Sequence, residues 1–158
     1  MNKSTIKSHN SSSKKSGRRS ALVRDDRDRA KRSAIMASVR RAHTGPELKV
    51  RQLVREAGFQ YRLHEARLSG TPDLVIPALC NAIFVHGCFW HRHQNCRLAT
   101  TPKTNVEFWN EKFAANVARD RRNERRLRRQ GWRVMVIWQC ETLAVDKLRK
   151  RLLRFLSK

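Results

Sequence analysis

The sequence predicts an α/β fold in which a mixed β-sheet is flanked by helices. Segments with helical periodicity come before and after short runs of β-branched and aromatic residues. One late run, residues 134–137, is almost continuously apolar, as expected of a strand that is covered on both faces of a sheet. The order helix, strands, long helix, buried strand, helix places helices against the sheet rather than in a separate bundle.

The first half of the predicted domain contains two helices and three strands. A short helix is expected at about 33–42, where Met36 and Val39 have helical spacing. The second helix follows the capping-box pattern Thr44-Gly45-Pro46-Glu47 and ends at Gly58. Its expected apolar face consists of Leu48, Val50, Leu53, Val54 and Ala57. Strands are expected at 59–63, 73–76 and 82–85, separated by turn signals such as Pro77.

The second half is predicted to contain a long helix, a buried strand and a final helix. The long helix spans about 105–130 and ends at Gly131. Its expected buried side carries Phe108, Trp109, Phe113, Val117 and Leu127, and arginines fill much of the rest. The final amphipathic helix, about 142–156, is expected to use Leu143, Leu148, Leu152 and Leu156.

Composition indicates a polyanionic partner. The 158 residues include 36 Lys and Arg against 13 Asp and Glu, a formal net charge of +23. Such an excess is typical of nucleic-acid binding, although a ribosomal-type structural protein or an anionic-membrane binder has a similar composition. No apolar run approaches the roughly 18 residues of a membrane span, and no apolar segment follows the basic N-terminus as in a secretory signal. We therefore expect a cytoplasmic, reducing setting, in which four cysteines suit metal binding better than disulfides.

The first 30 residues are predicted to form a disordered basic arm, followed by a single domain at 31–158. Residues 1–33 carry eleven basic and three acidic side chains, a net charge of +8, and almost nothing apolar. Such a segment cannot bury enough surface to offset its ordering entropy. It either contacts phosphates without sequence preference or serves as a solubilising tail.

Residues 84–96 concentrate metal-ligating side chains. Cys88, His93 and Cys96 have the spacing Cys-x4-His-x2-Cys, and Cys140 follows a strand far downstream. Together they make a Cys₃His set, which is typical of a structural Zn²⁺ site with no open coordination position. Cys80 is left over and is expected to be a small buried residue.

A closed zinc site cannot supply chemistry, so a second centre is needed, and Asp73 is the best candidate. It follows Pro72 at the start of a predicted strand in an otherwise cationic protein, where a carboxylate could hold a hard divalent ion against phosphate. Taken alone, the Pro-Asp pair fits an ordinary turn better than a metal site. The histidines of the 84–96 segment could exchange protons near neutral pH.

These motifs resemble the bacterial very short patch repair endonucleases. The resemblance rests on Gly70-Thr71-Pro72-Asp73 and on the string Ile83-Phe84-Val85-His86-Gly87-Cys88-Phe89-Trp90-His91, and it extends through Phe108-Trp109, residues 116–120 and 131–134 to Cys140. It implies a restriction-endonuclease-like core of the PD-(D/E)XK superfamily, with a structural zinc site. It also implies Mg²⁺-dependent nicking on the 5′ side of the thymine in T:G mismatches, which arise by deamination of 5-methylcytosine.

The resemblance also implies roles for individual residues. Asp73 would bind Mg²⁺ through its carboxylate and Val85 through its main-chain carbonyl, although the family often has Thr at this position. His91 would be the general base or proton shuttle, and Asp120 would orient it. His86 and Glu47 would lie around the water shell of the metal. The acidic-x-Lys pair that is usual in the superfamily is absent, so a histidine mechanism must replace the lysine.

Several of these residues have simpler interpretations. Asp120 would suit an ion pair with its arginine neighbours, and Glu47 would suit the helix cap. Phe89 and Trp90 could be core residues, whereas the resemblance implies that they wedge into the base stack while Met36 enters from the opposite groove. His43 and His64 are isolated in the sequence and are expected at the surface.

Two other functions stay open on the sequence: a related nuclease with a different DNA target, and a zinc-stabilised DNA-binding protein without catalysis. The implied partner is double-stranded DNA with a T:G mismatch, and other mismatch-repair proteins are further candidate partners. The family default is a monomer.

Overall fold

The computed structural model describes residues 42–157. The predicted arm at 1–30, Met36 and nearly all of the helix expected at 33–42 lie outside the described residues. The described residues form a mixed sheet of four strands in the order β1-β2-β3-β4, with three α-helices, which confirms the predicted α/β class.

The sheet combines antiparallel and parallel pairing. β1 (Arg62–Leu63) pairs antiparallel with β2 (Leu74–Ile76), and β2 pairs antiparallel with β3 (Asn81–His86). β3 pairs in parallel with β4 (Arg133–Trp138), from Asn81 opposite Arg133 to His86 opposite Trp138. A parallel pair needs a long crossover, and α3 (Val106–Arg129) lies within that connection.

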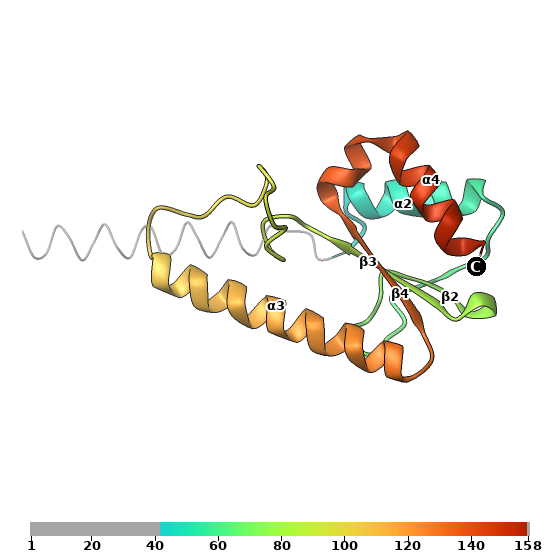
Figure 1. Ribbon diagram of the computed structural model, residues 1–158, viewed down its shortest axis with the longest axis horizontal. Helices are drawn as coiled ribbons and strands as arrows, with labels where there is room; N and C mark the ends of the chain where they lie inside the picture. Colours follow the sequence, from blue (N-terminus) through green and yellow to red (C-terminus); the bar gives the residue numbers. More distant parts are fainter. Residues whose placement is uncertain (1–41, 158) are drawn as a thin grey trace, which may run out of the picture. The chain divides into compact units, whose positions relative to one another are not determined.

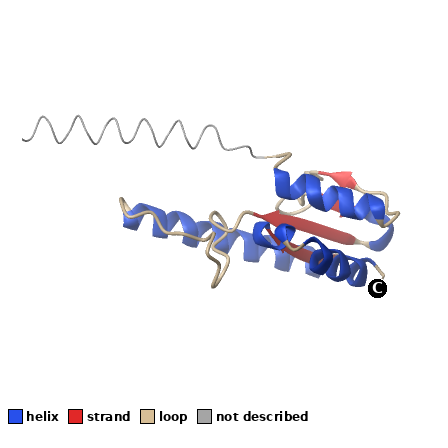
Figure 2. Cartoon of the chain, turned by 90° about the horizontal axis from the view of Figure 1, so that it is seen from above, coloured by secondary structure: helices blue, strands red, loops and turns tan. Residues whose placement is uncertain are grey.

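Helices cover both faces of the sheet, as Figures 1 and 2 show. α2 (Gly45–Glu56) and α4 (Val145–Leu156) pack on one face. Their buried side chains join those of the strands in one core: Val50, Leu53, Val54, Leu74, Ile76, Ile83, Met135, Ile137, Leu148, Leu152 and Leu156. On the opposite face, Leu127 of α3 packs on Ala82 and Phe84 of β3. The loop at 87–105 connects the end of β3 to the beginning of α3.

The helices lie close to where periodicity predicted them, but some side chains that were expected to be buried are exposed. Leu48 is 51% exposed because Val50, Leu53 and Val54 place the buried stripe on another side of α2. Phe108 is 54% exposed, since Trp109 and Phe113 mark the buried side of the first turns of α3. The expectation that Leu48 and Phe108 are core residues is therefore wrong.

The final helix and Cys80 also differ from expectation. α4 begins at Val145, and a 3₁₀ segment (Gln139–Leu143) precedes it, so Leu143 is 79% exposed instead of lying on the apolar face. Cys80 is exposed rather than buried, because it closes a 3₁₀ turn (Pro77–Leu79) in a left-handed conformation, with φ of 48°. Across residues 42–157, no helix has the length and apolarity needed to cross a bilayer.

Candidate active site and metal centre

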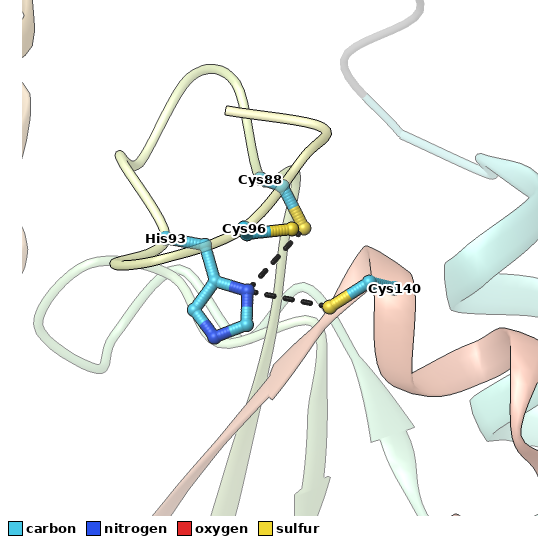
Figure 3. A group of neighbouring side chains, drawn as sticks. All are labelled: Cys88, His93, Cys96 and Cys140. Carbon is cyan, nitrogen blue, oxygen red and sulfur yellow. Dashed lines mark hydrogen bonds between the residues drawn. The ribbon is translucent and has the colours of Figure 1, made fainter. Parts of the chain in front are cut away.

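The four predicted zinc ligands come together at the end of β3. The sulfurs of Cys88, Cys96 and Cys140 and a ring nitrogen of His93 all lie within 4.8 Å of one another (Figure 3). His93 Nδ1 is 3.7 Å from Cys88 Sγ and 3.3 Å from Cys140 Sγ. Tetrahedral zinc bonds of about 2.0–2.3 Å would place its ligand atoms at similar separations. The cluster could therefore bind a metal ion with little movement.

The electrostatics of this cluster also suit a bound cation. Burial and the neighbouring thiols raise the pKa of Cys140 to about 12, and burial raises the pKa of Cys88. The backbone N–H of Leu98 lowers the pKa of Cys96. Three thiols this close cannot all ionise without a counter-charge, which a divalent metal would provide.

Two polar side chains on α3 hold the loop that carries these ligands. Asn116 donates a hydrogen bond from Nδ2 to the Trp90 carbonyl at 3.2 Å. One turn later, Asp120 Oδ2 lies 2.5 Å from His91 Nδ1. Residues at i and i+4 share one helix face, so both anchors reach the same loop.

His86, His91 and Asp120 form a compact group. The His86 and His91 rings stack with centroids 3.9 Å apart and planes 8° apart. Burial and the neighbouring His91 lower the pKa of His86 to about 3, so His86 is neutral at physiological pH. Burial acts to raise the pKa of Asp120, but the hydrogen bond and charge of His91, with Arg119, leave it below its usual value. The group therefore pairs a carboxylate with a histidine whose Nδ1 faces it.

Asp73 immediately precedes β2 and contacts the end of β3. Val85 N–H donates to Asp73 Oδ2 at 2.7 Å, where the β2–β3 ladder has ended. Burial is the main cause that raises the pKa of Asp73 to about 6; the Val85 hydrogen bond opposes this shift, and the charge of Glu47 adds to it. The Asp73 carboxylate is thus desolvated and close to a second carboxylate, which is unfavourable without a cation nearby.

The predicted catalytic residues fall into two adjacent groups. Asp73 contacts Val85, and its pKa is affected by the charge of Glu47, whereas His91 contacts Asp120 and His86. In the described part of the chain, Asp73 belongs to neither of the two clusters that gather three or more candidate ligand atoms within 4.8 Å. Val85 and His86 are consecutive residues of β3, so both groups contact the same end of that strand.

Glu47 has a different role from the predicted capping box. Its carboxylate accepts hydrogen bonds from His43 N–H and from the Thr44 hydroxyl, both at 2.9 Å, and Thr44 does not cap a backbone N–H. Arg51, one turn along α2, pairs with Glu47 Oε2 at 3.0 Å. The arginine also contacts His43, which is exposed as predicted, and the half-buried His64, so both histidines have a polar partner in the structure. The i and i+4 spacing of Glu47 and Arg51 is the signal that could have revealed this network.

Phe89 and Trp90 lie on the loop after β3, are half-buried, and pack against aromatic side chains of α3. Phe89 packs edge-to-face on Trp90, Trp109 and Phe113, with centroids 4.9, 5.6 and 5.2 Å away. The partial exposure of Phe89 and Trp90 fits either role considered from the sequence, a support for the loop or a surface that meets DNA.

An open cavity of about 870 Å³ lies beside His91 and Asp120. His86, Arg121 and Trp138 also line it, so cationic, acidic and aromatic groups face the same space. Such a mixed lining suits a charged polymer better than an apolar ligand.

Comparison with known proteins places this site in a family. Residues 24–98 match the family model described as DNA mismatch endonuclease Vsr. The chain is 45% identical over 127 residues to the Type II nicking enzyme V.XorIIP of Xanthomonas oryzae pv. oryzae, covering 80% of this chain and 93% of that protein. It is 41% identical over 124 residues to the DNA mismatch endonuclease Vsr of Escherichia coli, covering 78% and 79% of the two chains. The Type II nicking enzyme V.NmeAIP of Neisseria meningitidis is 39% identical over 125 residues, covering 79% and 89%.

The resemblance seen in the sequence motifs is confirmed. We conclude that the chain is a DNA endonuclease, a hydrolase, and that it belongs to the family of the DNA mismatch endonuclease Vsr.

Proposed function

We propose that this protein nicks one DNA strand on the 5′ side of the thymine in T:G mismatches, in a Mg²⁺-dependent reaction. The proposal assigns the fold to the restriction-endonuclease-like PD-(D/E)XK superfamily. Its main support in the structure is that both groups contact the end of β3: Asp73 contacts Val85, and the ring of the next residue, His86, stacks on His91, which pairs with Asp120.

Mg²⁺ would be held by the Asp73 carboxylate and the Val85 carbonyl. In a strand, the N–H and C=O of one residue face the same neighbour, so this carbonyl lies on the side where Val85 N–H meets Asp73. Carboxylate and carbonyl oxygens are the ligands that Mg²⁺ prefers. The nearby negative charge of Glu47 favours a cation as well. When bound, Mg²⁺ relieves negative charge on the phosphate and makes a water molecule easier to deprotonate.

Replacing the Thr common in the family by Val85 leaves this arrangement intact. The contact to Asp73 uses the main chain of residue 85, which any side chain provides. The absent hydroxyl therefore removes no ligand that this proposal uses.

His91 would move the proton. The Asp120 carboxylate engages its Nδ1, which fixes the tautomer and leaves Nε2 free to exchange a proton with water or with a leaving oxygen. Asp120 also stabilises the imidazolium form by charge. The neutral ring of His86 packs on one face of His91 and limits its rotation.

The Cys88–His93–Cys96–Cys140 cluster would hold a structural Zn²⁺. Four protein ligands fill a tetrahedral shell and leave no position for a reacting water. The metal would instead fix the loop that carries His91, Phe89 and Trp90 against β4.

Recognition would combine a wedge with non-specific attraction. Phe89 and Trp90 lie on the metal-bound loop, and a T:G pair resists insertion of a side chain less than a matched pair does. Met36 is proposed to act from the opposite groove, but it lies outside the described residues. The net charge of +23 would attract the phosphate backbone.

Strand-resolved cleavage of end-labelled duplexes tests this function. One duplex carries a single T:G mismatch, and its control has identical sequence with a C:G pair at that position. We expect a single nick 5′ of the thymine, only with Mg²⁺, and no nick in the control or with Asp73→Asn. Equal cutting of both duplexes would assign a different DNA target, and binding without cutting would indicate a non-catalytic protein.

A further inference from the structure

A buried arginine on α2 gathers three side chains around one guanidinium group. Arg51 is only 6% exposed. Its Nη2 donates to Glu47 Oε2 at 3.0 Å and to His64 Nε2 at 3.1 Å, and its Nη1 donates to His43 Nδ1 at 2.7 Å. Arg51 therefore joins α2 to the loop before it and to the connection between β1 and β2.

Both histidines adopt a backbone conformation that favours glycine. His43 has φ of 58° and His64 has φ of 47°. Because a guanidinium group only donates hydrogen bonds, each ring presents an acceptor nitrogen to Arg51. The rings also pack edge-to-face with centroids 5.6 Å apart. Two strained residues held by the same side chain are more typical of a functional site than of an ordinary surface.

This network reaches Asp73 directly. His64 N–H donates to the Asp73 carbonyl at 3.4 Å, which fixes the backbone beside the Asp73 carboxylate. Glu47 is 4% exposed, and its charge acts on the same carboxyl group. Arg51 thus contacts the carboxylate of Glu47 directly and is linked to the Asp73 backbone through His64.

Stability alone does not account for Arg51. Its Nε is buried and has no hydrogen-bond partner among the described residues. A buried ion pair gains little over well-packed apolar side chains, and an unsatisfied donor makes it less favourable still. A guanidinium kept here despite that cost points to a role for the geometry that it imposes.

We propose that Arg51 is a positioning residue that holds Glu47 and the Asp73 segment at the spacing needed to bind a divalent cation. This inference rests on the proposed function, because it takes Asp73 as the cation-binding carboxylate. Arginine is required since its planar fork bonds to three acceptors at once. Lysine carries the same charge, but its three N–H donors share one nitrogen, which cannot occupy both the Nη1 position beside His43 and the Nη2 position beside Glu47 and His64.

The test compares Arg51→Lys with Arg55→Lys in the full-length, zinc-loaded protein without DNA. Arg55 lies one turn further along α2, is exposed, and contacts Tyr61 rather than Glu47. Mn²⁺ affinity is measured by electron paramagnetic resonance well below the unfolding temperature of each variant. We expect Arg51→Lys to weaken Mn²⁺ binding by about 10- to 100-fold, as loss of an outer-shell partner typically does, and Arg55→Lys to match the wild type.

Two further variants separate the possible failures. If the wild type binds Mn²⁺ no better than Asp73→Asn, the proposed cation site fails, and this inference fails with it. If Asp73→Asn loses binding while folded Arg51→Lys keeps wild-type affinity, only the positioning role is overturned. Should Arg51→Lys not fold, His64→Leu decides the question, because it removes the Nε2 contact with Arg51 and keeps the main-chain bond to Asp73. Weaker Mn²⁺ binding supports the role, and unchanged binding overturns it.

Discussion

At the scale of single residues, the site depends on side chains that act through a neighbour. His91 is oriented by Asp120, and Asp73 is anchored on Val85 N–H. Sequence motifs identified all four of these residues, because each belongs to a string that resembles the family. They could not show that Asp73 and His91 belong to separate contact groups, since that depends on which side of β3 each side chain occupies.

Replacing Asp120 by Asn should slow nicking without unfolding the protein. Asparagine can still accept the His91 Nδ1–H bond but carries no charge to stabilise the imidazolium form. We expect the single-turnover rate to fall by about 10²–10⁴-fold, the usual contribution of acid–base catalysis. The matched control is Glu124→Gln, one turn later on α3 and on the same cavity, where Glu124 pairs with Arg128. Equal effects of both substitutions would contradict the role of Asp120.

We expect the ionised carboxylate of Asp73 to lower the free energy of unfolding near neutral pH, although the proposed reaction needs it. Its folded pKa, about 6, lies above the usual value, so the folded state binds its proton more tightly than the unfolded state does. Stability is therefore present at low pH and is lost as pH rises through the interval from about 4 to 6, by about 2–3 kcal/mol at most.

Asp73→Asn should accordingly raise the unfolding temperature near neutral pH while nicking is lost. The measurement is the unfolding temperature of the wild type and of Asp73→Asn, each zinc-loaded and without Mg²⁺. It is made at neutral pH and at about pH 4. The difference between them should shrink at the lower pH. A variant less stable than the wild type at neutral pH would contradict the proposed desolvation of Asp73.

At the scale of elements, the cysteine–histidine cluster connects segments that are distant in the sequence. Cys88, His93 and Cys96 lie on the loop after β3, whereas Cys140 follows β4 (Figure 3). Ligand spacing was enough to predict this cluster, because few residue types bind zinc. The order of helices and strands was also predictable from periodicity. The exposure of Phe108 and Leu143 was not, since it depends on which side of α3 is buried and on where α4 begins.

Cys140→Ser should release the metal and destabilise the fold. Removing one of four ligands opens the coordination shell, and metal binding contributes to folding free energy. The exposed Cys80 offers a control with the same substitution outside the cluster. Elemental analysis should give one zinc per chain for Cys80→Ser and much less for Cys140→Ser. Unchanged zinc in Cys140→Ser would show that Cys140 is not a ligand.

At the scale of the whole molecule, charge sets the attraction for DNA, and not every arginine contributes equally. Arg128 pairs with Glu124 and donates to the Val134 carbonyl at 3.4 Å, so it has internal partners. Arg121 lines the cavity beside His91 and Asp120. Composition predicted the basic character but could not separate these two kinds of arginine.

The salt dependence of DNA binding should distinguish an arginine that contacts phosphate from one that has internal partners. Each phosphate contact contributes about −0.9 to the slope of log K against log salt. We expect Arg121→Gln to reduce the steepness by about one and Arg128→Gln to leave it unchanged. Fluorescence anisotropy with one duplex over a series of salt concentrations measures both. A larger change for Arg128→Gln would place the phosphates along β4 instead of beside His91.

The division between a structural metal and a catalytic one is tested most directly by anomalous diffraction from crystals of the zinc-loaded protein soaked in Mn²⁺. We expect a zinc peak among Cys88, His93, Cys96 and Cys140, and a separate manganese peak between the Asp73 carboxylate and the Val85 carbonyl. Manganese bound by His86, His91 and Asp120, with none at Asp73, would contradict it.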